Sequence, residues 1–188
     1  MTSFDTDSST AQSTAGYEGL FPISVRSGIG RGPTKLASFD SALLAASVAN
    51  FNLLHLTSVI PPASEVHVEE DHRGIPPEGG WGDRLYVVMA ECRVEVSHEE
   101  AWAALGWVQE EATGRGIFVE HIGHSRARVE ADIQSSLQAV CDARPGFSPG
   151  EFQMAIRGVT CEHEPVCALV IAAYESEPWR TAPVLTLP

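Results

Sequence analysis

The chain has 188 residues, 44% of them hydrophobic and 20% charged, which is typical of one soluble globular domain. Its net charge of −13 argues against nucleic acid and against an anionic membrane surface as partners. No apolar run reaches the roughly 18 residues of a membrane span, and no secretory signal opens the sequence. Four cysteines without a CxxC pair indicate free thiols, so a cytoplasmic location is expected.

The chain begins with a polar segment and continues into a segment dense in glycine. Residues 1–17 are rich in Ser, Thr and Asp and predict a disordered tail, because their apolar surface is too small to offset the entropy of ordering. The single folded domain is then expected to cover residues 18–188. Residues 28–33 contain GxGxG without the spacing of a Walker or dinucleotide-binding motif, so a tight turn is favoured over a phosphate site.

One helix and one strand are predicted next. A helix is expected from Ser38, its proposed N-cap, to about Ala49, because apolar residues recur there at helical spacing: Phe39, Ala42, Leu43 and Ala46. Residues 52–60 are rich in Leu, Val and Ile and predict one strand, which two prolines then stop. The polar segment 63–82 is expected to be a long loop.

Strands outnumber helices in the second half of the chain. They are predicted at residues 85–96, 116–122, 151–161 and 166–174. Segment 97–113 is left open, because its capping-box spacing favours a helix whereas its two tryptophans and glycine also fit a buried strand. The clearest helix covers residues 125–144 and has one apolar face: Val129, Ile133, Leu137 and Val140. This mixture predicts an α+β sandwich with helices covering sheets.

Two histidines follow Glu120 in a segment that holds possible metal ligands. The sequence is not HExxH, and on a strand His121 and His124 point to opposite faces. Surface or hydrogen-bonded histidines are therefore favoured over a metal site.

One block of the chain combines a glycine segment, a helix start, asparagines and a hydroxyl pair. Its residues are Thr34 and Leu36, Ser38-Phe39-Asp40 with Ala42-Leu43, Asn50-x-Asn52-Leu53, and Thr57-Ser58 closed by Pro61-Pro62. As a combination it resembles the pyruvoyl-dependent arginine decarboxylases. Residues 116–120, GIFVE, are similar to the family's second block, a strand ending in glutamate. The pattern of residues 161–174 is also similar, although no catalytic residue is expected there.

The resemblance implies that the chain cuts itself between Thr57 and Ser58. The Ser58 hydroxyl would attack the Thr57 carbonyl, and elimination and hydrolysis would leave a pyruvoyl group at the start of the piece 58–188. The piece 1–57 would remain associated with it. Because a peptide is a poor electrophile, this bond must be held strained and its oxyanion must find donors. Taken alone, Thr-Ser before Pro-Pro is also consistent with an ordinary strand end.

The resemblance further implies that arginine is converted to agmatine and carbon dioxide through a Schiff base on the pyruvoyl group, without metal or pyridoxal phosphate. Glu120 would be the proton donor. On a strand it shares a face with Phe118 and Ile122, and desolvation by such neighbours would keep a carboxyl protonated near neutrality. A glutamate that faces water at a strand end is the alternative.

The substrate pocket is implied to involve the predicted helix. Asp40 would bind the cationic end of the substrate, with Leu36 and Ser38 nearby, because a buried guanidinium needs a counter-ion. An aspartate in the first helical turn is also what the helix macrodipole favours without a ligand. Asn52 would position the cleavage site or polar groups of the substrate.

Two bulky residues, Phe51 and Phe118, depart from the family pattern. If they line the pocket, a different amino acid with the same mechanism is an alternative substrate. A non-catalytic homologue acting as an assembly or binding module is a second alternative, although the joint presence of Ser58, Glu120 and Asp40 argues against it. The resemblance implies a four-layer αββα sandwich, assembled as a homotrimer or hexamer with sites between protomers.

Overall fold

The computed structural model describes residues 20–69 and 77–179, so the tail predicted at residues 1–17 lies outside the described residues. The described part contains two helices and nine strands. In chain order these are β1 (Phe21–Arg31), α1 (Lys35–Ala45), β2 (Asn52–His55), β3 (Val59–Ile60), β4 (Ser64–Val68), β5 (Arg84–Val94), β6 (Glu100–Gln109), β7 (Gly116–Gly123), α2 (Arg126–Asp142), β8 (Gln153–Thr160) and β9 (Val166–Glu177). All four cysteines are buried and free, as expected.

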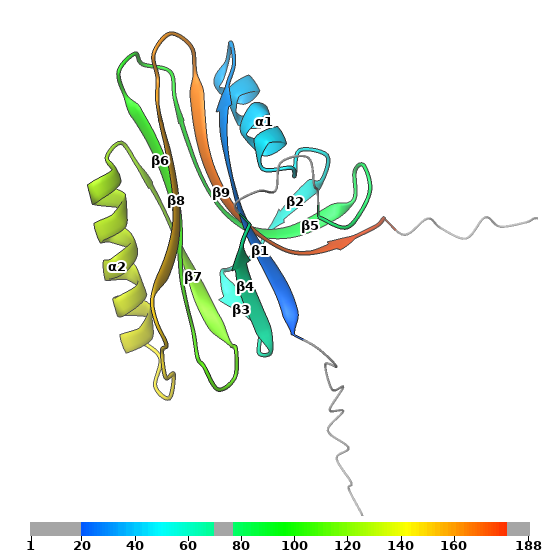
Figure 1. Cartoon of the computed structure of the whole chain (residues 1–188), viewed down its shortest axis with the longest axis vertical. Coiled ribbons are helices and arrows are strands. Elements are labelled where there is room, and N and C mark those ends of the chain that lie inside the picture. The colour runs from blue at the N-terminus through cyan, green and yellow to red at the C-terminus, as the bar shows by residue number, and fades with distance from the viewer. Residues whose placement is uncertain (1–19, 70–76, 180–188) are drawn as a thin grey trace, which may run out of the picture.

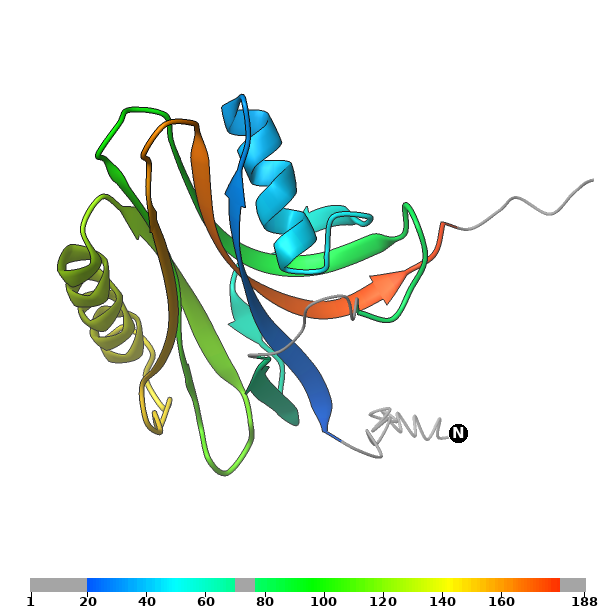
Figure 2. The same cartoon turned by 45° about the horizontal axis from the view of Figure 1, so that its top comes forward.

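The elements form four layers (Figures 1 and 2). A five-stranded sheet, in the order β2-β5-β9-β1-β4, faces a four-stranded sheet, in the order β3-β7-β6-β8. One apolar cluster fills the space between the sheets, and two others lie under α1 and under α2. Each helix therefore covers the outer face of one sheet, and the predicted αββα sandwich is confirmed.

Residues 28–31 of the glycine segment belong to strand β1, so the tight turn expected there was wrong. Gly28 and Gly30 lie directly under α1, where a Cβ atom would come within 2.1 Å of the Ala42 carbonyl oxygen and 1.9 Å of the Ser38 carbonyl oxygen. The glycines therefore allow the helix to lie close on the sheet.

Helix α1 begins four residues before the prediction, in which Ser38 was the N-cap. Its N-cap is Thr34, whose hydroxyl accepts a hydrogen bond from the Ala37 amide at 3.1 Å. Ser38 lies inside the helix, buried, and its hydroxyl donates to the Lys35 carbonyl at 2.9 Å. No acidic residue lies in the first turn, so Asp40 is not placed to stabilise the macrodipole there.

Helix α2 agrees closely with its prediction. Val129, Ile133 and Leu137 are buried on one face, and Cys141 completes this face in place of Val140. Among the described residues, neither helix is long and apolar enough to cross a membrane.

The structure corrects the prediction for two segments and decides it for a third that was left open. Residues 52–60 form two short strands instead of one, β2 at the edge of the five-stranded sheet and β3 at the edge of the four-stranded sheet. The expected loop at 63–82 contains β4, which pairs in parallel with β1. Segment 97–113, left open above, contains strand β6, which lies between β7 and β8.

Candidate active site

The link between β2 and β3 joins the two sheets. Before the link, the Leu56 amide donates to the Val87 carbonyl in β5 at 2.8 Å, which holds this side on the five-stranded sheet. After it, the Ser58 carbonyl accepts from the Phe118 amide in β7 at 2.8 Å, which holds that side on the four-stranded sheet. The Thr57–Ser58 peptide bond therefore lies between two fixed ends.

The backbone at Ser58 is strained. Its φ is +67°, in the left-handed region that a residue with a Cβ atom rarely adopts. Such a conformation costs about 1–3 kcal/mol and persists only where the surroundings hold it. Thr57 is exposed, so its carbonyl lies in an accessible link.

The hydroxyl of Ser58 is paired with a carboxylate. Ser58 Oγ donates a hydrogen bond to Glu120 Oε1 from β7, across 62 positions of sequence. Side chains alternate along a strand, so Glu120 lies on the same face of β7 as Phe118, whose amide holds the Ser58 carbonyl. The structure thus brings together Ser58 and Glu120, two of the residues singled out from the sequence.

The apolar environment expected around Glu120 is not found in the single chain. Glu120 is exposed, and Ile122, on the same face, is 55% exposed. The shared face was predicted correctly. However, β7 is buried only as far as Val119, and its last four residues are exposed or half-buried. Neighbours in this protomer do not desolvate the carboxylate.

Tyr174 belongs to this site and was missed from the sequence. It extends from β9 in the other sheet, and its hydroxyl donates to the Val59 carbonyl at 3.1 Å. Its ring packs edge-on against Phe118, with centroids 6.2 Å apart. Burial, and then the negative charge of Glu120, raise the pKa of the Tyr174 phenol, so it remains protonated and able to donate. The only signal in the sequence is a hydroxyl at the end of a long apolar strand.

The two phenylalanines that depart from the family pattern lie in apolar clusters. Phe118 is 2% exposed and packs between the sheets against Trp107, with ring centroids 5.9 Å apart. Phe51 is partly buried against the cluster under α1. In this protomer the Phe118 side chain packs in the core against Trp107 and Tyr174. Its proposed contact with substrate stays a prediction.

Asp40 and Leu36 lie on the outer face of α1. Both side chains are exposed, Leu36 by 70%, and they are one turn apart on the same side of the helix. Among the described residues, the side chain of Asp40 has no hydrogen bond or ion pair, and none joins α1 to Ser58 or Glu120. Ser38, by contrast, faces the sheet and is buried. In one copy of the chain, Asp40 is therefore not bonded to the Ser58–Glu120 pair.

Asn52 lies at the start of β2 and is bonded locally. Its amide Nδ2 donates to the Gly82 carbonyl, and its backbone amide donates to the Asp83 carbonyl at 2.7 Å. These bonds fix the beginning of the strand that leads to the link. The expected role of Asn52 at the substrate stays a prediction.

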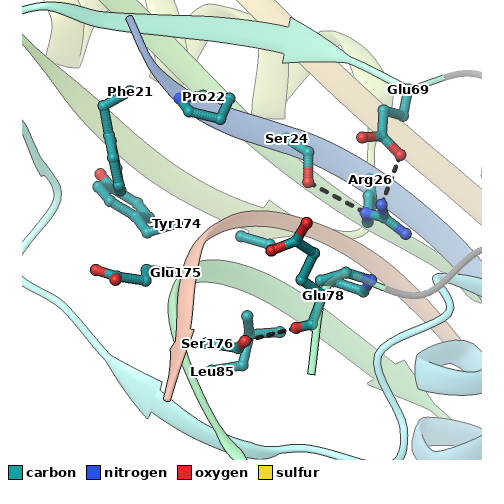
Figure 3. A pocket seen from close by; sticks show the side chains of 12 residues that line it. Phe21, Pro22, Ser24, Arg26, Glu69, Glu78, Leu85, Tyr174, Glu175 and Ser176 are labelled. Carbon is teal, nitrogen blue, oxygen red and sulfur yellow. Dashed lines mark hydrogen bonds and ion pairs between the residues drawn. The ribbon is translucent and has the colours of Figure 1, made fainter. Parts of the chain in front are cut away.

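Tyr174 is one of the residues that line a cavity of about 490 Å³ (Figure 3). Ser58 and Glu120 do not line it. Its lining includes Arg26, which is 4% exposed and held by Glu69 at 2.7 Å and by Ser24 at 3.2 Å. Ser24 and Arg26 alternate with core residues of β1, so this part of the lining lies on the outer face of the five-stranded sheet.

The histidines after Glu120 have separate partners. His121 Nε2 lies 2.7 Å from the Ser136 hydroxyl, and His124 Nδ1 lies 2.9 Å from the Glu100 carbonyl. Within residues 20–69 and 77–179 no three or more His, Cys, Asp or Glu side chains are grouped as a metal site.

Comparison with known proteins agrees with the resemblance noted from the sequence. The family model described as pyruvoyl-dependent arginine decarboxylase matches residues 22–177, and the chain belongs to this family. It is 31% identical over 160 residues to the pyruvoyl-dependent arginine decarboxylase of Halobacterium salinarum, an alignment covering 83% of this chain and 96% of that protein. It is also 31% identical over 139 residues to the pyruvoyl-dependent arginine decarboxylase of Thermococcus sibiricus, covering 73% and 84%.

Proposed function

We propose that the chain cuts itself between Thr57 and Ser58 and that the processed protein decarboxylates arginine to agmatine and carbon dioxide. The observation that carries the proposal is the Ser58 hydroxyl, paired with the Glu120 carboxylate on a backbone held at positive φ. A fold alone does not define an activity. The Ser58–Glu120 pair adds a hydroxyl from which a pyruvoyl group can form, and the family's name refers to this group.

Self-cleavage begins at the Ser58 hydroxyl. Glu120 Oε1 orients Oγ through its hydrogen bond, and the hydroxyl proton passes to the Ser58 nitrogen as Oγ bonds to the carbonyl carbon of Thr57. The C–N bond then breaks and the amide becomes an ester. Loss of the Ser58 α-proton breaks the bond between Cβ and Oγ, which releases Thr57 as a carboxylate and leaves dehydroalanine. Water then hydrolyses the dehydroalanine, whose nitrogen leaves as ammonia, and residue 58 becomes a pyruvoyl group.

The residues around Ser58 fit such a group. Once formed, a pyruvoyl group supplies the electron sink that decarboxylation of an α-amino acid requires. The Phe118 amide continues to hold the carbonyl of residue 58. The Glu120 carboxyl, beside the former Oγ position, is the group placed to deliver a proton to the substrate carbon that has lost carbon dioxide.

We infer that a second copy of the chain completes the site. Asp40 offers a carboxylate that has no partner among the described residues, and a carboxylate is the counter-ion that a guanidinium needs when it leaves water. Leu36 beside it exposes apolar surface that assembly would cover. We infer that α1 of one protomer faces the Ser58–Glu120 pair of another, in a trimer or hexamer, which would also desolvate Glu120.

The proposal is tested on purified wild-type protein by denaturing gel and intact mass. We expect two pieces, residues 1–57 and 58–188, the larger with a blocked, borohydride-reducible terminus. Carbon dioxide release is then measured across a panel of amino acids, with arginine expected to be the best substrate. A single full-length species without activity would contradict the proposal and favour a binding module, whereas preference for another amino acid would correct the substrate alone.

Asp40→Asn is expected to raise the KM for arginine roughly 10- to 100-fold, the range of a hydrogen bond to a charged group, while cleavage proceeds normally. Steady-state kinetics with arginine, beside a gel of the same sample, measure both effects. Asp142→Asn, at the exposed end of α2, is the matched control and should behave as wild type. An unchanged KM in Asp40→Asn would remove this residue from the binding site.

A further inference from the structure

Strand β3 is an edge strand, and this leaves one of its carbonyls without a partner in the sheet. It pairs with β7 on one side only. In an antiparallel pair, successive residues alternate between bonding to the neighbouring strand and pointing away from it. The Ser58 carbonyl bonds to β7, so the Val59 carbonyl points away from that strand.

The carbonyl of Val59 is satisfied from the opposite sheet. Tyr174 in β9 reaches across the sandwich and donates its phenol hydroxyl to this oxygen at 3.1 Å. Its ring is fixed from two sides, by Phe118 at 6.2 Å and by Phe21 at 6.4 Å between ring centroids. The hydroxyl therefore comes from a side chain with little freedom to turn away.

We propose that Tyr174 is a positioning residue that holds residue 58 beside Glu120 through the carbonyl of Val59. The proposal rests on the proposed function, because it concerns the same self-cleavage and the same decarboxylation. It adds to that function a residue in a part of the chain where the sequence indicated no role in catalysis.

Before cleavage, the hydrogen bond helps to hold the strained backbone. The Phe118 amide binds the carbonyl of Ser58, and Tyr174 binds the next carbonyl, so the chain is fixed on two sides directly after the residue at φ +67°. A strained conformation persists only where its surroundings determine it fully. Without the phenol, the link can relax and move Ser58 Oγ away from the carbonyl that it attacks.

After cleavage, the need for the hydrogen bond increases. Breaking the Thr57–Ser58 bond makes residue 58 a chain end, and chain ends fray unless they are tied down. The hydrogen bond from Leu56 to the five-stranded sheet then no longer holds residue 58, because Leu56 belongs to the other piece. The Tyr174 hydrogen bond takes over this function, because it connects the new chain end to β9 of the same sheet within the piece 58–188.

Tyr174→Phe isolates the hydroxyl, because it keeps the ring between Phe21 and Phe118. We expect slower self-cleavage and a kcat about tenfold lower, since a small displacement of reacting groups has effects of this size or larger. The KM for arginine should be unchanged, because the cationic end of the substrate is bound elsewhere. Cleavage is followed by denaturing gel after synthesis, and the kinetic constants are measured per cleaved, folded chain.

Tyr86→Phe is the matched control. Its hydroxyl donates to the Glu177 carboxylate at 3.0 Å on the same sheet, away from the link, so its cleavage and kcat should equal those of wild type. Phe21→Leu loosens one side of the Tyr174 ring but keeps the hydroxyl, so it should lower kcat less than Tyr174→Phe does, even if its melting temperature falls.

The outcomes separate this proposal from the one on which it rests. Wild-type rates in Tyr174→Phe would overturn the role of Tyr174 while leaving the proposed function intact. Equal losses of kcat in Phe21→Leu and Tyr174→Phe would assign the effect to packing and also overturn it. A wild-type chain that neither cleaves nor releases carbon dioxide would overturn the proposed function, and the role of Tyr174 with it.

Discussion

Ser58→Ala is expected to leave the chain in one piece and to abolish decarboxylation. The substitution removes the only atom that the proposed cleavage uses as nucleophile, the Oγ paired with Glu120. The fold should be retained, because the Phe118 amide bonds to the backbone carbonyl of residue 58 and not to its side chain. Intact mass and a denaturing gel measure the chain, and carbon dioxide release from arginine measures the activity.

Ser47→Ala provides a closely matched control. Ser47 also has a hydroxyl on a residue at positive φ, +61°, but it lies directly after α1 and before β2, outside the link. This variant should cleave and decarboxylate as wild type does. Two pieces from Ser58→Ala, or measurable activity in its full-length chain, would be incompatible with a cofactor made from Ser58.

Glu120→Gln is expected to cleave and yet to turn over slowly. The amide oxygen of glutamine can still accept a hydrogen bond from Ser58 and so can orient the nucleophile. It has no proton to deliver at the acid strength of a carboxyl, and loss of a positioned proton donor lowers kcat by about 10²- to 10⁴-fold. Single-turnover and steady-state rates on the cleaved variant measure this loss.

Glu65→Gln tests whether the effect is specific to position 120. Glu65 is likewise an exposed glutamate on a strand, in β4, and no role is proposed for it. Its kcat should be that of wild type. Full turnover by Glu120→Gln would exclude Glu120 as the proton donor, and failure to cleave would show instead that the carboxylate is needed as a base in processing.

Periodicity along the sequence was sufficient where an element has one continuous face. Helix α2 was predicted within two residues at each end, because three of its buried residues recur at helical spacing. It failed where one apolar segment serves two sheets. Residues 52–60 read as a single strand, since a local pattern does not indicate which sheet each half joins, and the break at Ser58 is what places its hydroxyl in the site.

Contacts between distant segments explain the remaining differences. Gly28 and Gly30 suggested a turn, because the helix that approaches them is visible only in the folded chain. Tyr174 was overlooked for the same reason, since its partner Val59 is 115 positions away. Glu120 was identified through the family resemblance, whereas its exposure depends on where β7 leaves the core.

The position of β1 determines what self-cleavage would do to the architecture. This strand belongs to the shorter piece, and it lies between β9 and β4, both of which belong to the longer one. Cutting the link would therefore not separate the two pieces, which would stay joined through backbone bonds on both edges of β1. The mature protein would behave as one cooperative unit, and neither piece could be exchanged between molecules without unfolding.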